Sequence, residues 1–245
     1  MLYSLHNLLF QSDFIKDIKE FFKDKKKLII FDVGCYKGVF TKKILNTFNG
    51  NIKHIYLFDI NKKVKKYIYF LKKKKYISYH EIALSHSTGS SIYNYNKFFE
   101  SAGSSLSNLV KNDKKWNFSR RVITGDFNKR DNGFSNYNVK TSTLDTFVRK
   151  KKIKYIDICK VDIEGSELDF LKGSKKTLKQ NKIKILAIEV LDNKKKFIKK
   201  EKQIIALLKK NNFKLIKKKD IKSVSFLSNL KGRDYLFLNY KYKNN

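Results

Sequence analysis

Apolar residues recur along this chain with two different periods. Across residues 4–23 they follow helical spacing, which predicts a helix. Further along, short continuous apolar runs, typical of buried parallel strands, alternate with stretches of helical spacing. The pattern predicts strands at 28–33, 52–59, 76–84, 155–161 and 183–190, and helices at 39–48, 62–71, 144–149, 166–178 and 195–210. This alternation indicates an α/β fold with a mainly parallel sheet covered by helices on both faces.

Two parts of the chain depart from this rhythm. Residues 86–140 are rich in Ser, Asn and Gly, which predicts loops and short strands inserted over one end of the sheet. A lid over a substrate site would belong in such an insertion. Near the end of the chain, strands at 214–218 and 235–240 are predicted to form an antiparallel hairpin at one edge. We therefore expect an N-terminal helical extension, 1–27, followed by one domain, 28–245.

The chain carries a formal net charge of +34, which raises the question of an acidic partner. Its lysines stand in short runs along the whole length, and the chain contains no proline. This composition favours amino acids with A/T-rich codons, so one interpretation is a genome-wide bias that gives a solvated lysine surface. The alternative is an acidic partner: a nucleic acid, an anionic membrane, or a phosphorylated or nucleotide-linked substrate.

The sequence indicates neither a membrane span nor a secretory leader. No apolar run approaches the roughly 18 residues that a span requires. The N-terminal residues lack the basic segment and cleavage site of a signal peptide. We therefore expect no transmembrane segment and a cytoplasmic location. Cys35 and Cys159 lie far apart without metal-ligand spacing, which predicts two buried, reduced thiols.

The strongest local motif is the turn after the first predicted strand. Asp32 lies at the end of the strand, and Gly34 and Gly38 follow it in the pattern D-x-G-x-x-x-G. Gly34 permits a tight turn and the close approach of a ligand to the backbone. Gly38 begins the next helix, whose free N–H groups favour a carboxylate or phosphate. The spacing differs from the G-x-G-x-x-G of dinucleotide-binding proteins, and a purely structural turn is the alternative.

Acidic residues end two further predicted strands. Asp59 ends the second strand, where a carboxylate can accept hydrogen bonds from both ribose hydroxyls of an adenosine. Asp162 and Glu164 follow the strand at 155–161, which places them beside the glycine turn in a parallel sheet. Carboxylates packed so closely repel one another unless a cation, a hydrogen-bond donor or a methyl acceptor is shared between them. Ser166, just beyond, is predicted to cap the next helix.

Together these motifs resemble the FkbM-type S-adenosylmethionine-dependent methyltransferases. The resemblance covers about residues 28–192 and rests on 32–38, Asp59, 83–85, 104–106, 143–145, 160–173 and 189–190. It implies a Rossmann-like class I methyltransferase fold with a mainly parallel seven-stranded sheet, and usually O-methylation of sugars or natural products. The chain departs from the family pattern at two places. The family usually has Glu-Pro where Asp59-Ile60 stands, and small residues where Cys35 and Tyr36 stand.

The resemblance also implies which residues bind S-adenosylmethionine. They are Asp32, Gly34 and Gly38 at the methionine end, Asp59 at the ribose, and Glu81 and Ala83 near the adenine. Methyl transfer from a sulfonium is a direct displacement, so much of its rate depends on positioning.

A sugar hydroxyl is a poor nucleophile at neutral pH, and assistance by a base or a metal is expected. The predicted catalytic carboxylates are Asp162, Glu164 and Glu189. A Mg²⁺ ion held by Asp162, Glu189 and Asp192 is the alternative to plain general-base catalysis.

Three classes of function are compatible with these motifs. The leading one is O-methylation of a sugar, a glycan or a related small molecule. A methyltransferase acting on RNA or another nucleic acid would use the basic surface, but the lysines are dispersed and no added RNA-binding module is recognisable. A non-catalytic scaffold of the same fold is the third. The complete set of glycines and acids argues against it, although the fold by itself does not name an acceptor.

Overall fold

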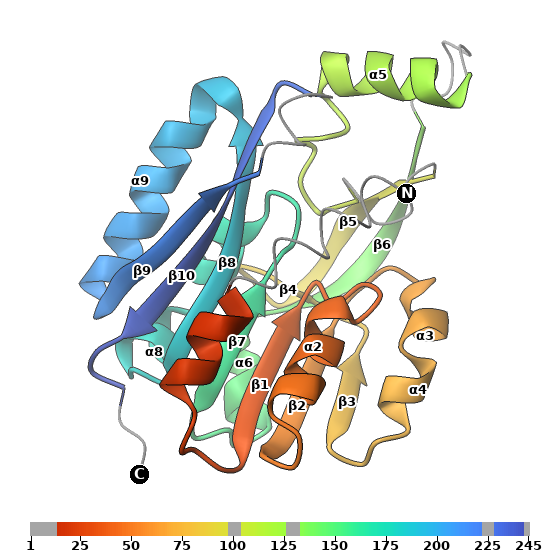
Figure 1. Ribbon diagram of the computed structural model, residues 1–245. Helices are drawn as coiled ribbons and strands as arrows, with labels where there is room; N and C mark the ends of the chain where they lie inside the picture. The colour runs from red at the N-terminus through yellow and green to blue at the C-terminus, as the bar shows by residue number, and fades with distance from the viewer. Residues whose placement is uncertain (1–13, 98–103, 126–132, 222–227, 243–245) are drawn as a thin grey trace.

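The computed structural model describes residues 14–97, 104–125, 133–221 and 228–242 (Figure 1). The strands of the main sheet are β1 (Leu28–Val33), β2 (Ile52–Phe58), β3 (Ile77–His80), β7 (Ile156–Val161), β8 (Ile183–Asn193), β9 (Phe213–Asp220) and β10 (Leu230–Asn239). A second sheet contains β4 (Ala83–Leu84), β5 (Gly89–Asn96) and β6 (Phe134–Ser142). The helices are residues 14–21, α2 (Val39–Thr47), α3 (Val64–Tyr67), α4 (Tyr69–Lys72), α5 (Lys114–Thr124), α6 (Leu144–Lys150), α7 (Glu167–Lys172), α8 (Lys175–Lys179) and α9 (Lys194–Lys210).

The main sheet confirms the predicted fold class. Its seven strands have the order β3-β2-β1-β7-β8-β10-β9. Neighbouring strands from β3 to β8 pair in parallel, whereas β10 is antiparallel to both β8 and β9. The hairpin expected near the end of the chain is therefore present at one edge of a mixed sheet. The chain changes direction across the sheet between β1 and β7, and open α/β sheets bind ligands at the carboxyl ends of such strands.

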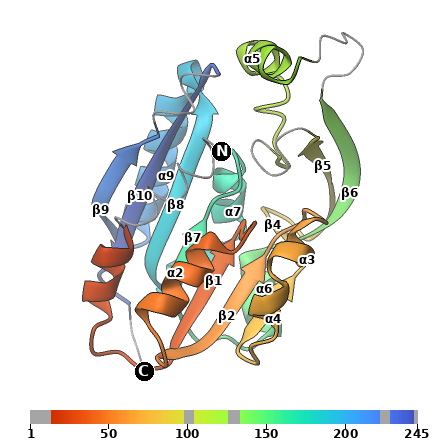
Figure 2. The same ribbon diagram turned by 45° about the vertical axis from the view of Figure 1, so that its right-hand side comes forward.

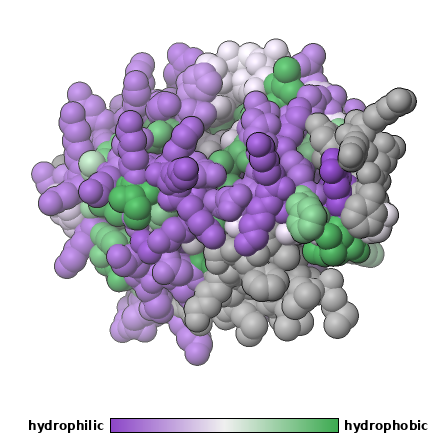
Figure 3. All heavy atoms as spheres, turned by 90° about the horizontal axis from the view of Figure 1, so that it is seen from above, coloured by the Kyte–Doolittle hydropathy of each residue, from purple (hydrophilic) through white to green (hydrophobic). Residues whose placement is uncertain are grey.

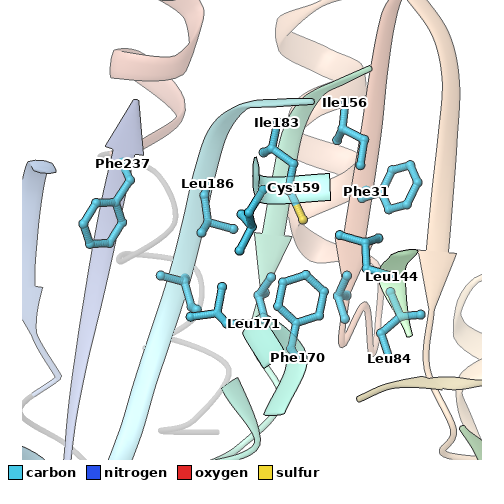
Figure 4. Packing of buried hydrophobic residues seen from close by; sticks show 14 of the residues in the cluster. Phe31, Leu84, Leu144, Ile156, Cys159, Phe170, Leu171, Ile183, Leu186 and Phe237 are labelled. Atoms are coloured by element: carbon cyan, nitrogen blue, oxygen red, sulfur yellow. The ribbon is translucent and has the colours of Figure 1, made fainter. Parts of the chain in front are cut away.

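Helices cover the sheet on both faces (Figures 1 and 2). Residues 14–21, α2, α3 and α4 pack on one face, where Ile30, Ile158 and Ile185 are buried. Helices α6 to α9 pack on the other face, against Phe31 and Leu186 among other buried residues (Figure 4). Both cysteines are buried free thiols, as expected. No helix in the described ranges combines the length and apolarity that a membrane crossing requires.

The inserted stretch is more regular than predicted. It contains two long strands, β5 and β6, which pair antiparallel, and the 11-residue helix α5. Neither strand has a continuous apolar run, because one face of this small sheet is largely exposed. Helix α5 buries Trp116 and Arg120 on one side, and an arginine at a core position conceals the helical period. Asp113 caps this helix by accepting a hydrogen bond from the Trp116 N–H at 2.8 Å.

Three predicted elements are divided in the structure. The predicted helix at 62–71 is two short helices, α3 and α4, and the predicted strand at 76–84 is split between β3 and β4 in different sheets. The predicted helix at 166–178 breaks into α7 and α8 at Gly173. A Cβ at Gly173 would lie 2.0 Å from the Ser85 carbonyl oxygen, so this contact with the second sheet determines the break. Of the helix predicted at 4–23, residues 4–13 lie outside the described residues.

Candidate functional site

The predicted site residues converge on the carboxyl edge of the main sheet. They are Asp32 near the end of β1, Gly34 and Gly38 after β1, Asp59 after β2, Glu81 and Ala83 after β3, Asp162 and Glu164 after β7, and Glu189 in β8. Because all these strands are parallel, the segments that follow them meet at one edge. In the described part of the chain, hydrophilic side chains dominate the view onto this edge (Figure 3).

The glycine turn brings the β1 backbone against the end of β7. Gly34 has φ +77°, and a Cβ there would lie 1.8 Å from the Asp162 carbonyl oxygen. Its N–H donates to the Phe58 carbonyl at 2.9 Å, which ties the turn to β2 as well. Gly38, with φ +69°, precedes α2 and has no side chain that could cap it. The first-turn N–H groups of α2 are therefore suited to an anionic ligand group.

Asp59 joins the glycine turn to the end of β2. Its carboxylate accepts hydrogen bonds from the Tyr36 N–H at 2.8 Å and the Asn61 N–H at 2.9 Å, one to each oxygen. Burial raises the pKa of Asp59, and these backbone hydrogen bonds oppose the rise. A carboxylate offers about four lone-pair positions, so the half-buried group retains acceptor capacity for a ligand hydroxyl.

Glu81 and Ala83 lie just beyond β3. Glu81 is exposed and forms an ion pair of 2.5 Å with Lys65 on α3, so its carboxylate faces the outside of this edge. Ala83 begins β4 and pairs with Thr141 on β6. This pairing directs the chain away from the main sheet and into the second one.

Asp32 is a buried carboxylate beneath the glycine turn. It is fully buried, and one carboxylate oxygen accepts a hydrogen bond from the Thr41 hydroxyl at 2.7 Å. The other oxygen lies 3.6 Å from the Lys160 ammonium, which also lies 3.2 Å from the Asp162 carboxylate. Burial raises the pKa of Asp32, and Lys160 and Thr41 counteract this. Asp32 therefore orders the turn from below.

One face of the sheet carries a row of polar side chains toward this edge. The register pairs Asp32 with Lys160, Lys160 with Ala187, and Ala187 with Leu236, so these residues share a face. Two positions closer to the carboxyl edge, the same face carries Asp162 after β7, Glu189 on β8 and Asp234 on β10. The lower part of the same face is the apolar core against α2.

Glu189 and Asp234 lie directly opposite each other on β8 and β10. Burial raises the pKa of Glu189 well above its usual range, and the neighbouring Asp162 and Asp234 raise it further. Burial, followed by Asp162, raises the pKa of Asp234 to about 7, although Lys160 and Lys219 oppose this. Both carboxyl groups therefore favour the protonated form more than an ordinary carboxyl group does.

The sequence analysis did not identify Asp234, because its place opposite Glu189 depends on the register between distant strands. A lone acid beside Tyr235 in an apolar strand was the available signal.

The magnesium site considered from the sequence is not supported. Glu189 and Asp192 are three positions apart on β8, so they project from opposite faces of the sheet. Asp192 instead accepts a local hydrogen bond from the Asn193 N–H at 2.7 Å. In the described ranges, no group of three or more His, Cys, Asp or Glu side chains is arranged to hold a metal ion.

Glu164 lies in a strained turn that is stabilised by the buried residues Glu167 and Lys200. Its φ is +52°, and the N–H of Gly165 donates at 2.6 Å to Glu167, which is fully buried. Lys200 on α9 pairs with Glu167 at 2.7 Å and also donates to the Gly165 carbonyl at 2.8 Å. The turn that presents Glu164 is thus fixed by a buried ion pair on the opposite face of the sheet.

The second sheet contacts the same turn through two serines. The Ser105 hydroxyl donates to the Ile163 carbonyl at 3.0 Å and lies 3.2 Å from the Ser166 hydroxyl. The Ser166 side chain therefore pairs with Ser105 and does not cap α7, contrary to the prediction.

The inner face of the second sheet carries three tyrosines that the sequence analysis missed. Tyr93 and Tyr137 pair across β5 and β6, with ring centroids 5.3 Å apart, and Tyr95 lies 6.3 Å from Tyr137. Lys62 and Lys63, which follow Asp59, lie over the rings of Tyr137 and Tyr95. Burial raises the pKa of Tyr137 to about 12, and Tyr95 and Asp59 contribute to the rise. The tyrosines thus face the Asp59 end of the site.

Comparison with known proteins identifies the family of this chain. The sequence profile of the methyltransferase FkbM domain matches residues 32–215. The crystal structure of methyltransferase FkbM from Methylobacillus flagellatus KT aligns with a TM-score of 0.52 and 11% identity over 85% of this chain and 43% of its own. This chain therefore spans less than half the length of that protein. A comparison with curated protein sequences gave no significant match.

Other solved structures align with lower TM-scores. A putative RNA methyltransferase from Pyrococcus horikoshii has a TM-score of 0.46 and 11% identity over 94% of this chain and 82% of its own. A putative tRNA methyltransferase from Streptococcus pneumoniae, in complex with S-adenosyl-L-methionine, has a TM-score of 0.46 and 9% identity over 95% of this chain and 75% of its own. At such identities these likenesses concern the fold alone and carry no information about the substrate.

Proposed function

Since the chain belongs to the family of methyltransferases with an FkbM domain, we propose that it transfers the methyl group of S-adenosylmethionine to a hydroxyl group of a sugar, glycan or related small molecule. The observation that carries this proposal is the pairing of Glu189 directly opposite Asp234, on the face of the sheet that also carries Asp162 beside the glycine turn. A hydroxyl acceptor must lose a proton, and a carboxylate of this pair can accept it.

The residues at the carboxyl edge fit the groups of S-adenosylmethionine. The first turn of α2, opened by Gly38, suits the methionine carboxylate. The acids beside Gly34 suit the methionine ammonium, and the remaining acceptor capacity of Asp59 suits the ribose hydroxyls. Tyr93 and Tyr137 offer aromatic surface on the side of Asp59 where the adenine would lie.

When bound, S-adenosylmethionine supplies an electrophilic methyl group on a positively charged sulfur. The contribution of the protein is to orient the acceptor and to remove its proton. A carboxylate whose pKa is raised is a stronger base than an ordinary carboxylate, which favours Glu189 with Asp234 as its partner. Asp162 and Glu164, at the end of β7, orient the acceptor hydroxyl beside this pair.

The tyrosine face supports an acceptor rich in polar groups. The Tyr95 hydroxyl is buried, and no described residue forms a hydrogen bond with it. A buried hydroxyl without a partner costs about 1–3 kcal/mol. A ligand hydroxyl offers a partner to this group, which a purely apolar acceptor would not.

A methyl-transfer assay with labelled S-adenosylmethionine tests this function. The acceptors are free sugars, nucleoside-diphosphate sugars and total RNA, and the variants are Glu189→Gln and Asp162→Asn. We expect transfer to a sugar hydroxyl, with kcat reduced by about 100-fold or more in Glu189→Gln. Asp169→Asn, which removes an exposed acid paired with Lys172, is the control that retains activity. Methylation of RNA alone, or an unchanged kcat in both variants, would contradict the proposal.

A further inference from the structure

Lys160 is a lysine buried within a strand of the main sheet. The residue is 8% exposed and occupies the face of β7 that leads to the candidate site. Lysine is almost never buried to this extent unless it is paired. The role of Lys160 is therefore defined by the groups around its ammonium.

The ammonium of Lys160 connects the end of β7 to the glycine turn. It donates to the Gly34 carbonyl oxygen at 2.9 Å and lies 3.2 Å from the Asp162 carboxylate and 3.6 Å from the Asp32 carboxylate. A lysine ammonium has three N–H donors, which matches these three oxygens. One side chain thus contacts the turn beside the proposed cofactor site and the acid beside the proposed acceptor site.

The charges around Lys160 come from every strand near this edge. They include Asp32 on β1 with Cys35 in the following turn, Asp59 after β2, Asp162 after β7, Glu189 on β8 and Asp234 on β10, with Lys219 on β9 facing Asp234.

The charge of Lys160 acts on three of these acids. Burial lowers the pKa of Lys160, but Asp162 and Asp32 outweigh this and raise it above the usual value, so the lysine stays charged. In turn, Lys160 lowers the pKa of Asp32, Asp59 and Asp234 against the effect of burial. Loss of this charge removes the cation that lies between Asp32 and Asp162.

We propose that Lys160 is a positioning residue that couples cofactor binding to the acceptor site, by locking the Gly34 carbonyl and the Asp162 carboxylate in one arrangement. The inference rests on the proposed function, because it concerns the same cofactor site. A Gly34 carbonyl released from Lys160 changes the turn at which the cofactor amino acid binds. The same release frees Asp162 from its fixed position next to Glu189.

Titration calorimetry with S-adenosylhomocysteine from pH 5 to pH 9 tests this role. In Lys160→Met we expect the affinity to fall by about tenfold or more at pH 7. Acid weakens binding as Asp32 becomes protonated, and without the lysine this midpoint should move upward by about one pH unit. Lys160→Arg, which restores the positive charge, should return the midpoint to its wild-type position.

The matched control is Lys25→Met. Lys25 forms an ion pair with the fully buried Asp157 at the opposite end of the same strand, far from the site. This variant should lose stability but retain the wild-type affinity and pH midpoint. If Lys160→Met does not fold, Lys160→Gln, which keeps a polar group there, carries the same test.

The outcomes separate the two proposals. An affinity and pH midpoint equal to wild type in the neutral Lys160 variant would overturn the positioning role and leave the proposed function intact. Absence of S-adenosylhomocysteine binding by the wild-type protein would instead contradict the proposed function itself.

Discussion

The local sequence predicts only some of the residues that meet at the carboxyl edge. The glycines of the turn were recognisable by their spacing, and the structure gives the reason for Gly34, which is contact with the Asp162 carbonyl. Asp234 was not recognisable, because its position opposite Glu189 arises from strand register. Spacing therefore predicts residues in one turn better than residues that meet across the sheet.

Gly34 and Gly50 provide a matched pair for testing this contact. Both have φ +77°, but a Cβ at Gly50 meets no atom within 4 Å. We expect Gly50→Ala to lower the free energy of unfolding by about 1 kcal/mol, the cost of a left-handed alanine. Gly34→Ala should cost about 3 kcal/mol or more, because the overlap adds to the same strain. Equal losses in urea titrations of the two variants would show that the close approach is absent.

The Asp234 carboxyl group makes stability depend on pH. Its folded pKa of about 7 lies above the unfolded value near 3.9, so the folded state holds more protons between these values. The stability contribution is therefore fully present below about pH 4 and is lost as the pH rises through 7. We expect the free energy of unfolding of Asp234→Asn to exceed that of wild type by about 1–3 kcal/mol at pH 8 and to equal it at pH 4. Urea titrations that give the same difference in unfolding free energy between variant and wild type at both pH values would contradict this pH dependence.

At the scale of elements, the apolar pattern predicted most of the main sheet. Strands β1 and β8 are covered on both faces, so burial requires long apolar runs that are easy to recognise. The breaks in the predicted elements depend on tertiary contacts, such as Gly173 against the Ser85 carbonyl. Strand β6 is polar at most positions and α5 buries an arginine, so neither shows a simple period.

Helix α9 is anchored to the site by one ion pair. Lys200 contacts Glu167, the Gly165 carbonyl and the Leu191 carbonyl, all within 2.8 Å. Lys200→Met leaves the buried Glu167 charge without its partner, which should cost about 3–5 kcal/mol of unfolding free energy. The exposed Lys202 on the same helix is the control, and Lys202→Met should change stability by less than about 0.5 kcal/mol. Similar chemical-denaturation midpoints for the two variants would disprove the anchoring role.

At the scale of the whole molecule, positive charge exceeds negative charge by 34. Described ion pairs engage only some of the lysines, and many of the other described lysines are exposed. The like charges repel in the folded state, and salt screens exposed charges over a Debye length of about 10 Å at 0.1 M. This surface alone does not distinguish a solvated coat from an acidic partner.

Unfolding in urea at low and high salt tests the balance of these charges. We expect the free energy of unfolding to rise between about 0.02 M and about 0.5 M NaCl, because screening weakens the net repulsion. Over this range the Debye length falls from about 20 Å to about 4 Å. A fall over the same range would show that attractive ion pairs dominate the surface.

The most direct test of the whole account is calorimetric titration of S-adenosylhomocysteine into the wild-type protein and Asp59→Ala. Asp17→Ala, which removes an acid paired with Lys217 on the surface, is the control. The account predicts one binding site in the wild type and in the control. It also predicts an affinity at least about tenfold weaker in a folded Asp59→Ala, equivalent to about 1.4 kcal/mol. A wild-type protein that binds no S-adenosylhomocysteine, or an Asp59→Ala variant that binds equally well, would contradict the cofactor site at this edge.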